Sequence, residues 1–139
     1  RNPQALDEVL DDDVSWLISG PADYVDLYGF RRGKAAVIEL ITRVMPCYHR
    51  ITGFEIEQLL VQDDHVAILG KVYSRQRETG RALRFGYTHF LQFRNGKLTA
   101  FRALADSYDA VSQIMGCRIV ARGGATLVPA ETEGDLAVV

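Results

Sequence analysis

Four extended segments follow one another between residues 51 and 105, and only short turns separate them. The segments alternate apolar and polar residues, as in ITGFEIEQLLV and HVAILGKVYSRQ, and the turns are QDD, ETG and RNG. Turns of this length and composition between alternating runs are typical of antiparallel β-hairpins. The sequence therefore predicts a four-stranded antiparallel meander, with one face of the sheet covered by the rest of the chain.

The residues that flank the meander predict three helices and one further strand. The helices are expected at residues 3–10, 34–45 and 107–115, and the strand at Val14 to Ser19. Pro46 is expected to end the middle helix, because the residue before a proline is pushed out of the helical region. Gly116 is expected to end the last one. Helices beside a meander of this kind predict an α+β domain.

Composition limits the partners that the chain can have. Its 139 residues are 47% hydrophobic, enough for one domain with a buried core. The formal net charge is −2 and no basic run occurs, so neither a nucleic acid nor a membrane is expected as a partner. The start is unlike a signal peptide, and the two cysteines suggest no disulfide framework. These features predict a cytoplasmic protein with a single domain over residues 1–120 and a loosely held tail over residues 121–139.

The third segment of the meander places a histidine on an apolar face. Read with the two-residue period of a strand, one side carries Phe85, Tyr87, His89, Leu91 and Phe93. On the fourth segment Phe101 alternates with Ala103 and Ala105, and the small side chains leave room for a cavity inside a concave sheet. His89 is then either a satisfied core histidine or a side chain that points at a ligand.

The opposite side of the sheet is predicted to be the outer, charged face. Lys71 and Arg75 share it with Tyr73 on the second segment, and Glu55 and Glu57 on the first segment could face them. Each such cross-strand pair contributes only about 0.2 to 1 kcal/mol.

Metal and cofactor sites are not predicted. His49 and His65 are expected to lie far from each other and from His89, without the spacing of a zinc site. Cys47 and Cys117 have no neighbouring base or cysteine. The RGGA stretch near the tail neither follows a strand nor opens a helix, so a nucleotide is not expected either.

Four stretches carry a family resemblance: LDEVLDDDVSW, GFRRGKAAVI ahead of a helix, DDHVAILGKVYSRQRETGR, and HFLQFRNGKLTAFRALAD. Over about Leu6 to Met115 the chain resembles the nuclear-transport-factor-2-like superfamily, in its SnoaL-like polyketide-cyclase and ketosteroid-isomerase-like branch. The resemblance implies a conical α+β barrel, in which a curved antiparallel sheet wraps around a long helix and encloses a deep apolar pocket. It also implies a homodimer formed through the outer face of the sheet.

The resemblance implies positions for catalytic groups as well. His89 falls where ketosteroid isomerase holds a protonated acid that donates to an oxyanion, and a histidine can also donate there. The carboxylate base of that enzyme would stand at Ile18, a hydrocarbon that takes no proton. Its tyrosine donor lies on a first helix that a chain beginning at Arg1 is expected to lack. The epoxide-hydrolase branch would need an aspartate near Ala103 and an Arg-x-Asp pair on the third segment, which is missing, so neither mechanism is expected.

The candidate catalytic residues are His89, Tyr87 and Asp106. Tyr87 could donate its hydroxyl to a ligand oxygen or bond to the backbone. Asp106 matches an aspartate that often follows the last strand in the cyclase-like branch, and it is also a preferred N-cap for the helix that begins at Ser107. The candidate ligand-binding residues are side chains expected at the wall and mouth of the pocket: Trp16, Ile18, Tyr24, Tyr28, Phe85, Leu91 and Phe101.

Two functions fit these residues. The favoured hypothesis is a cofactor-independent isomerase, cyclase or dehydratase acting on a small apolar molecule with a carbonyl or hydroxyl, in which Asp106 orients His89 or serves as the base. The alternative is a non-catalytic module that binds a small ligand or a protein. A second titratable group within hydrogen-bond reach of His89 would favour the enzyme, whereas a lone imidazole would favour binding.

Overall fold

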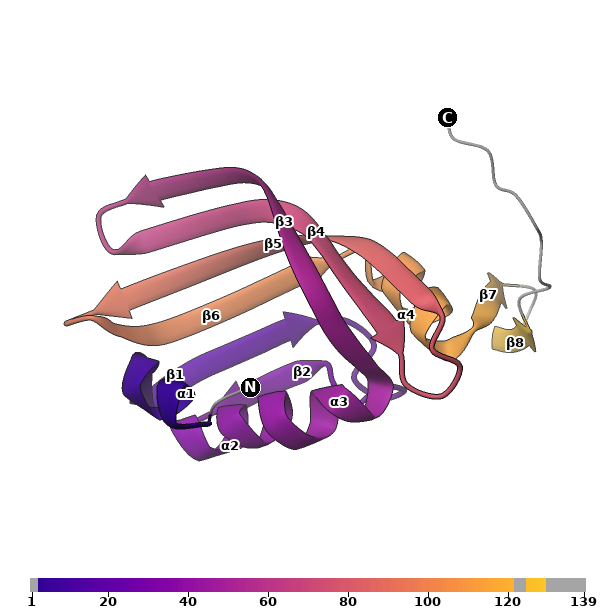
Figure 1. Cartoon of the computed structure of the whole chain (residues 1–139), viewed down its shortest axis with the longest axis horizontal. Helices are drawn as coiled ribbons and strands as arrows, with labels where there is room; N and C mark the ends of the chain where they lie inside the picture. The colour runs from indigo at the N-terminus through magenta and orange to yellow at the C-terminus, as the bar shows by residue number, and fades with distance from the viewer. Residues whose placement is uncertain (1–2, 122–124, 130–139) are drawn as a thin grey trace.

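A curved mixed sheet is the main element of the molecule, and a long helix runs beside its first two strands (Figure 1). The structure is a computed structural model that describes residues 3–121 and 125–129. In that part of the chain the sheet has six strands: β1 (Leu10–Ser19), β2 (Gly29–Arg32), β3 (His49–Gln62), β4 (His65–Gln76), β5 (Ala82–Arg94) and β6 (Lys97–Ala105). Their order across the sheet is β2-β1-β6-β5-β4-β3, so β2 and β3 form its edges.

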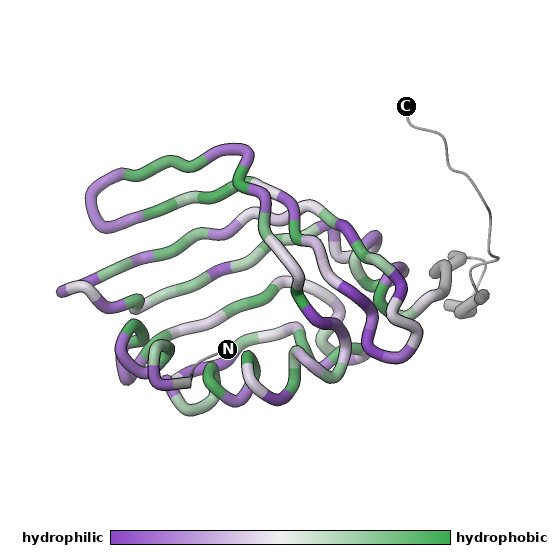
Figure 2. The backbone as a smooth tube through the Cα atoms, in the orientation of Figure 1, coloured by the Kyte–Doolittle hydropathy of each residue, from purple (hydrophilic) through white to green (hydrophobic). Residues whose placement is uncertain are grey.

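Strands β3 to β6 confirm the predicted meander, because each pairs antiparallel with the next. Asp63 and Asn95 adopt left-handed φ angles of 52° and 51° in two of the connecting turns, a conformation that Asp and Asn tolerate better than most residues. Hydrophilic and hydrophobic residues alternate along these strands (Figure 2). The alternation gives the sheet one apolar face and one more polar face.

Strand β1 attaches the N-terminal part of the chain to the meander. It pairs parallel with β6 and antiparallel with β2, a short edge strand that the sequence pattern does not predict. The strand begins at Leu10 rather than at Val14, directly after helix α1 (Pro3–Val9). Both residues are buried in a core cluster with Val37 and Leu40 of the following helix.

The middle helix continues past the residue that was expected to end it. It consists of α2 (Lys34–Glu39), a π-helical turn η1 (Leu40–Val44) and α3 (Met45–Tyr48). The expectation that Pro46 stops the helix is therefore wrong. Proline lacks an N–H, and its ring clashes with the carbonyl four residues earlier in an α-helix. The wider π-helical turn just before Pro46 accommodates both effects, and the helix runs on to Tyr48.

The last predicted helix is confirmed as α4 (Ser107–Met115). The carboxylate of Asp106 accepts the backbone N–H of Asp109 at 3.1 Å, and Gly116 ends the helix with a φ of 65°. Val111 and Ile114 of α4 belong to a second core cluster, which also contains Tyr28 from the β1–β2 loop. The helix thereby covers the end of the sheet at which β5 begins.

A hairpin crosses the boundary between the predicted domain and the predicted tail. Strand β7 (Cys117–Ala121) pairs antiparallel with β8 (Ala125–Pro129), and the sequence pattern predicts neither strand. Residues 122–124 and 130–139 of that tail lie outside the described residues. Within the described chain, no helix is both long enough and apolar enough to cross a membrane.

Candidate functional site

A cavity of about 340 Å³ lies on the concave side of the sheet. Its wall is made by β1, the β1–β2 loop, the π-helical turn and α3, strands β3 to β6, and α4. None of the described residues that line it is Asp, Glu, Lys or Arg. The polar side chains of the wall are Tyr28, His49, Tyr87 and His89. The volume lies at the lower end of the roughly 300 to 1,000 Å³ that small-molecule sites occupy, and apolar walls with few polar groups are typical of them.

His89 and Tyr87 are neighbours on the cavity side of β5. Their ring centroids are 4.2 Å apart with an interplanar angle of 37°, and the His89 ring also lies 4.8 Å from that of Phe101. Among the described residues, neither the His89 imidazole nor the Tyr87 hydroxyl has a hydrogen-bond partner. Polar groups inside proteins are nearly always paired, so these two are suited to bond with something in the cavity.

Burial sets the protonation of both groups. It lowers the pKa of His89 from 6.5 to about 4, so the imidazole is neutral at pH 7 and offers one donor and one acceptor. It raises the pKa of Tyr87, so this phenol keeps its proton and can donate it. His89 and Tyr87 therefore present neutral hydrogen-bonding groups to the cavity rather than ions.

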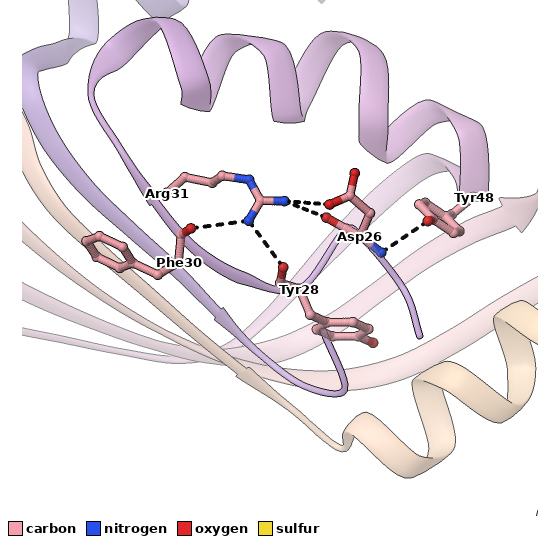
Figure 3. Close-up of polar contacts among 5 residues, drawn as sticks. All are labelled: Asp26, Tyr28, Phe30, Arg31 and Tyr48. Atoms are coloured by element: carbon pink, nitrogen blue, oxygen red, sulfur yellow. Dashed lines mark hydrogen bonds and ion pairs between the residues drawn. The ribbon is translucent and has the colours of Figure 1, made fainter. Parts of the chain in front are cut away.

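Tyr28 enters the cavity wall from a loop that Arg31 holds in place (Figure 3). The Arg31 guanidinium donates to the backbone carbonyl of Asp26 at 2.7 Å and to its carboxylate at 2.9 Å, and more weakly to the carbonyls of Tyr28 and Phe30. The Tyr48 hydroxyl at the end of α3 accepts the backbone N–H of Asp26 at 3.1 Å. Burial raises the pKa of Tyr28 to about 12, so its hydroxyl also stays protonated.

Trp16 and Phe101 form one side of the cavity. Their rings stack with centroids 3.8 Å apart and an interplanar angle of 18°, across the parallel pairing of β1 with β6. Ile18 lines the cavity from β1, and Phe85 does so from β5. The structure thus brings together around one cavity four residues whose faces were predicted from strand parity: Trp16, Ile18, Phe85 and Phe101.

The three other predicted site residues lie elsewhere. Asp106 caps α4 and is not in the cavity wall, so the structure does not bring it to His89. Tyr24 is 75% exposed and also lies outside the wall. Leu91 is on the predicted face of β5, but it packs against the first core cluster instead of lining the cavity.

His49 is a cavity residue that the sequence analysis missed. It was expected to lie far from His89, yet both side chains line the same cavity. His49 is the first residue of β3 and only 4% exposed, and its ring centroid lies 6.1 Å from that of Phe85. His49 directly follows the apolar middle helix and begins the next strand. This position in the sequence is the signal that could have predicted a buried histidine.

The described residues contain no group of three or more His, Cys, Asp or Glu side chains that could hold a metal ion. His65 is exposed and lies outside the cavity, with 2.6 Å between its Nδ1 and the carboxylate of Asp64. The Cys47 thiol is free and exposed. The chemistry available in the cavity is therefore that of two imidazoles and two phenols in an apolar space.

Comparisons with known proteins agree with this architecture. A protein from Rhodopseudomonas palustris, provisionally named an isomerase, is 32% identical over 78% of this chain and 80% of its own, with a TM-score of 0.72. A nuclear-transport-factor-2-like protein of unknown function from Burkholderia pseudomallei is 22% identical over 81% and 84%, with a TM-score of 0.70. TerC, crystallised with polyporic acid, is 20% identical over 83% and 87%, also with a TM-score of 0.70.

The last two similarities show the fold alone, which is nuclear-transport-factor-2-like. No curated protein matches the chain. The model of the SnoaL-like domain matches residues 1–101, which is more than half of the sequence. The chain therefore belongs to the SnoaL-like domain family.

Proposed function

We propose that the protein binds a small, uncharged, largely apolar organic molecule that carries a carbonyl or hydroxyl group. The observation that carries this proposal is the pair formed by His89 and Tyr87, whose polar atoms have no partner among the described residues although both line an apolar cavity. A ligand oxygen can accept from the phenol and from the neutral imidazole, or donate to the imidazole nitrogen that carries no proton.

The lining also favours a ligand without charge. A buried ion must be paired, because an unpaired one loses its hydration without compensation, at a cost of several kcal/mol. The described lining residues include no Asp, Glu, Lys or Arg, and the His89 imidazole is neutral at pH 7. A carboxylate or an ammonium group is therefore disfavoured in this cavity.

Binding is supported better than proton-transfer catalysis. A general base works best when its pKa lies near the working pH, and burial lowers the pKa of His89 to about 4. Asp106, the candidate partner, is used as a helix cap. Tyr87 is beside His89, but its raised pKa makes it a hydrogen-bond donor rather than a base.

The test is a ligand titration with matched phenylalanine variants. Isothermal titration calorimetry with an uncharged phenol such as 1-naphthol should show binding that weakens by about three- to tenfold in Tyr87→Phe and in His89→Phe, as expected for one lost hydrogen bond. Tyr73→Phe, on the outer face, is the control and should bind as the wild type does. Equal affinity for all four proteins would show that the polar pair does not contact the ligand.

A second candidate is an isomerase or cyclase that needs no cofactor. It is favoured by the relative that is 32% identical and provisionally named an isomerase. It is also favoured by a phenol and a neutral imidazole that lie side by side, because both can donate to a carbonyl oxygen. By polarising the carbonyl, such an enzyme would make the α-hydrogens of a bound ketone more acidic, so that a solvent base removes one and the enolate takes a deuteron from the solvent. NMR should show exchange faster than in buffer for the wild type and at the buffer rate for His89→Phe. Exchange at the buffer rate in both proteins would contradict the isomerase hypothesis, and the binding function would remain.

We also propose a homodimer formed through the outer face of the sheet. That face carries exposed apolar side chains on neighbouring strands: Phe30, Leu60, Leu69, Phe90 and Leu104. Large apolar side chains gathered on one exposed face commonly mark an interface. Sedimentation equilibrium should give a dimer at micromolar concentration, and Phe90→Glu should shift it to a monomer. A monomeric wild type would contradict the proposal.

A further inference from the structure

One side chain of the cavity wall reaches the solvent. Phe54 of β3 lines the cavity, yet 56% of its surface is exposed. Among the described residues that line the cavity, it is the only one with more than half of its surface exposed. A side chain that borders both the cavity and the solvent lies at the mouth of the cavity. The mouth therefore lies at β3, which is an edge strand of the sheet.

The polar pair of the cavity lies next to this side chain. The rings of Phe54 and Tyr87 meet edge to face, with centroids 5.7 Å apart and an interplanar angle of 84°. Tyr87 in turn lies against His89, and only 6% of the Tyr87 surface is exposed. A path from the solvent at Phe54 to His89 therefore leads past the Phe54 ring and then along that of Tyr87.

The strand that carries Phe54 is held on one side only. In the described sheet β3 pairs with β4 alone, and its register shifts once before Phe54 and once after Ile56. Such shifts interrupt the ladder of hydrogen bonds between two strands. Open space adjoins the preceding Gly53, because nothing lies within 4 Å of a Cβ built there. The exposed side of the Phe54 ring gives it room to turn outward, and the contact with Tyr87 opposes that turn.

We infer that Phe54 is the gate of the cavity: its ring turns away from Tyr87 to admit a ligand and then returns to cover it. This inference rests on the proposed binding function, since it names the residue that controls access to the same site. One edge-to-face aromatic contact favours the closed position over the open one by about two- to tenfold. The ring slows entry by the same factor, because only the open fraction of the protein takes up ligand.

The kinetic test follows the fluorescence of Trp16, which lines the cavity and is the only tryptophan of the chain. Stopped-flow mixing with para-tert-butylphenol, an uncharged phenol, gives the rates of association and dissociation. Phe54→Ala should raise the association rate by about two- to tenfold and the dissociation rate by at least as much. Phe54→Leu stays apolar but loses the aromatic contact, so it should also associate faster than the wild type.

Two further variants distinguish a gate from an ordinary wall residue. Truncating a residue that only contacts the ligand changes mainly the dissociation rate, and Phe85→Leu in the wall should behave in this way. Ile56→Ala is the matched control, because Ile56 lies on the same strand and is also 56% exposed, but does not line the cavity. It should keep both wild-type rates. Association at the wild-type rate in Phe54 variants that still bind the phenol would overturn the gate and leave the binding function standing.

A second measurement tests the gate without any ligand. Diethyl pyrocarbonate acylates neutral imidazoles, and peptide mass spectrometry follows each histidine separately. At pH 7 the neutral His89 should react about two- to tenfold faster in Phe54→Ala than in the wild type, because the reagent enters by the same path. The exposed His65 should react equally fast in both proteins and serves as the internal reference. Equal rates at His89 would overturn the gate, even if the phenol does not bind and the binding function itself fails.

Discussion

The rings of Tyr87 and His89 lie against each other on β5, 4.2 Å apart, and the side chain of neither residue bonds to another described residue. The same apolar surroundings lower the pKa of His89 and raise that of Tyr87, so both groups are neutral at pH 7. The pair can therefore form hydrogen bonds with a ligand without a change of charge. The burial that keeps both groups neutral has measurable consequences.

The first consequence is a dependence of stability on pH. Because the folded pKa of His89 is about 4 and the unfolded value is 6.5, the unfolded state binds more protons between these limits. The contribution to the free energy of unfolding is fully present above pH 6.5 and is lost as the pH falls toward 4, by about 3 kcal/mol at most. Urea unfolding at pH 4.5 and 7.5 should show a smaller loss for His89→Phe than for the wild type. An equal loss of unfolding free energy in both proteins would show that the titrating group is not His89.

Gly70 should resist replacement by alanine. A Cβ at this position would overlap the backbone oxygen of Glu55 and would lie 2.9 Å from the Tyr87 hydroxyl. Backbone atoms cannot move aside cheaply, so Gly70→Ala should lower the free energy of unfolding by about 1 to 3 kcal/mol and displace Tyr87. Gly53→Ala is the control, because nothing lies within 4 Å of a Cβ there. Chemical denaturation of the two variants checks the difference, and equal stabilities would contradict it.

Arg31 should matter for binding although it does not line the cavity. Its guanidinium holds the Asp26 backbone and thereby the loop that carries Tyr28 into the wall (Figure 3). Arg31→Ala should weaken binding of an apolar phenol severalfold by releasing that loop. Arg32→Ala, on the same short strand, should bind normally. The proposed role of the loop would be refuted by unchanged affinity in Arg31→Ala.

Asp106 should act on stability and not on binding. Its carboxylate caps α4 through the N–H of Asp109, and loss of such a cap costs about 1 kcal/mol. Asp106→Ala should therefore lower the midpoint of denaturation, whereas Asp106→Ser should restore most of it. Both variants should bind ligand as the wild type does. A loss of binding in a folded Asp106→Ala protein would contradict this prediction and show that Asp106 contributes to ligand binding.

Strand parity explains how much of the site the sequence could predict. The face that carries Phe85, Tyr87 and His89 follows from a regular two-residue period, and β5 keeps that period over this stretch. Leu91 has the same parity but packs in the core, because parity fixes the face and not the place where a helix covers it. From the sequence, Asp106 could be a catalytic residue or the N-cap of a helix. Only the position of α4 in the structure distinguishes these two roles.

His49 could not be predicted by parity because β3 is irregular. His49 and Ile51 line the cavity from odd positions, but Phe54 does so from an even one, since the pairing with β4 shifts between Ile51 and Gly53. The helix was mispredicted for a related reason. Pro46 is a strong local signal for a helix end, and the π-helical turn that overrides it has no comparable signature in the sequence.

The register shifts of β3 also bear on what a change in the length of this strand would do to the cavity. A one-residue slip in a strand exchanges its two faces, and a bulge confines such a slip to one part of the strand. Ile51 and Gly53 pair with consecutive residues of β4, so deleting Thr52 would remove the irregularity and keep His49, Ile51 and Phe54 on the cavity side. Deleting Phe54 would instead place Glu55, now on the outer face beside Lys71, opposite Val72 in the cavity wall. The position at which β3 loses a codon thus decides whether the cavity stays neutral or becomes acidic.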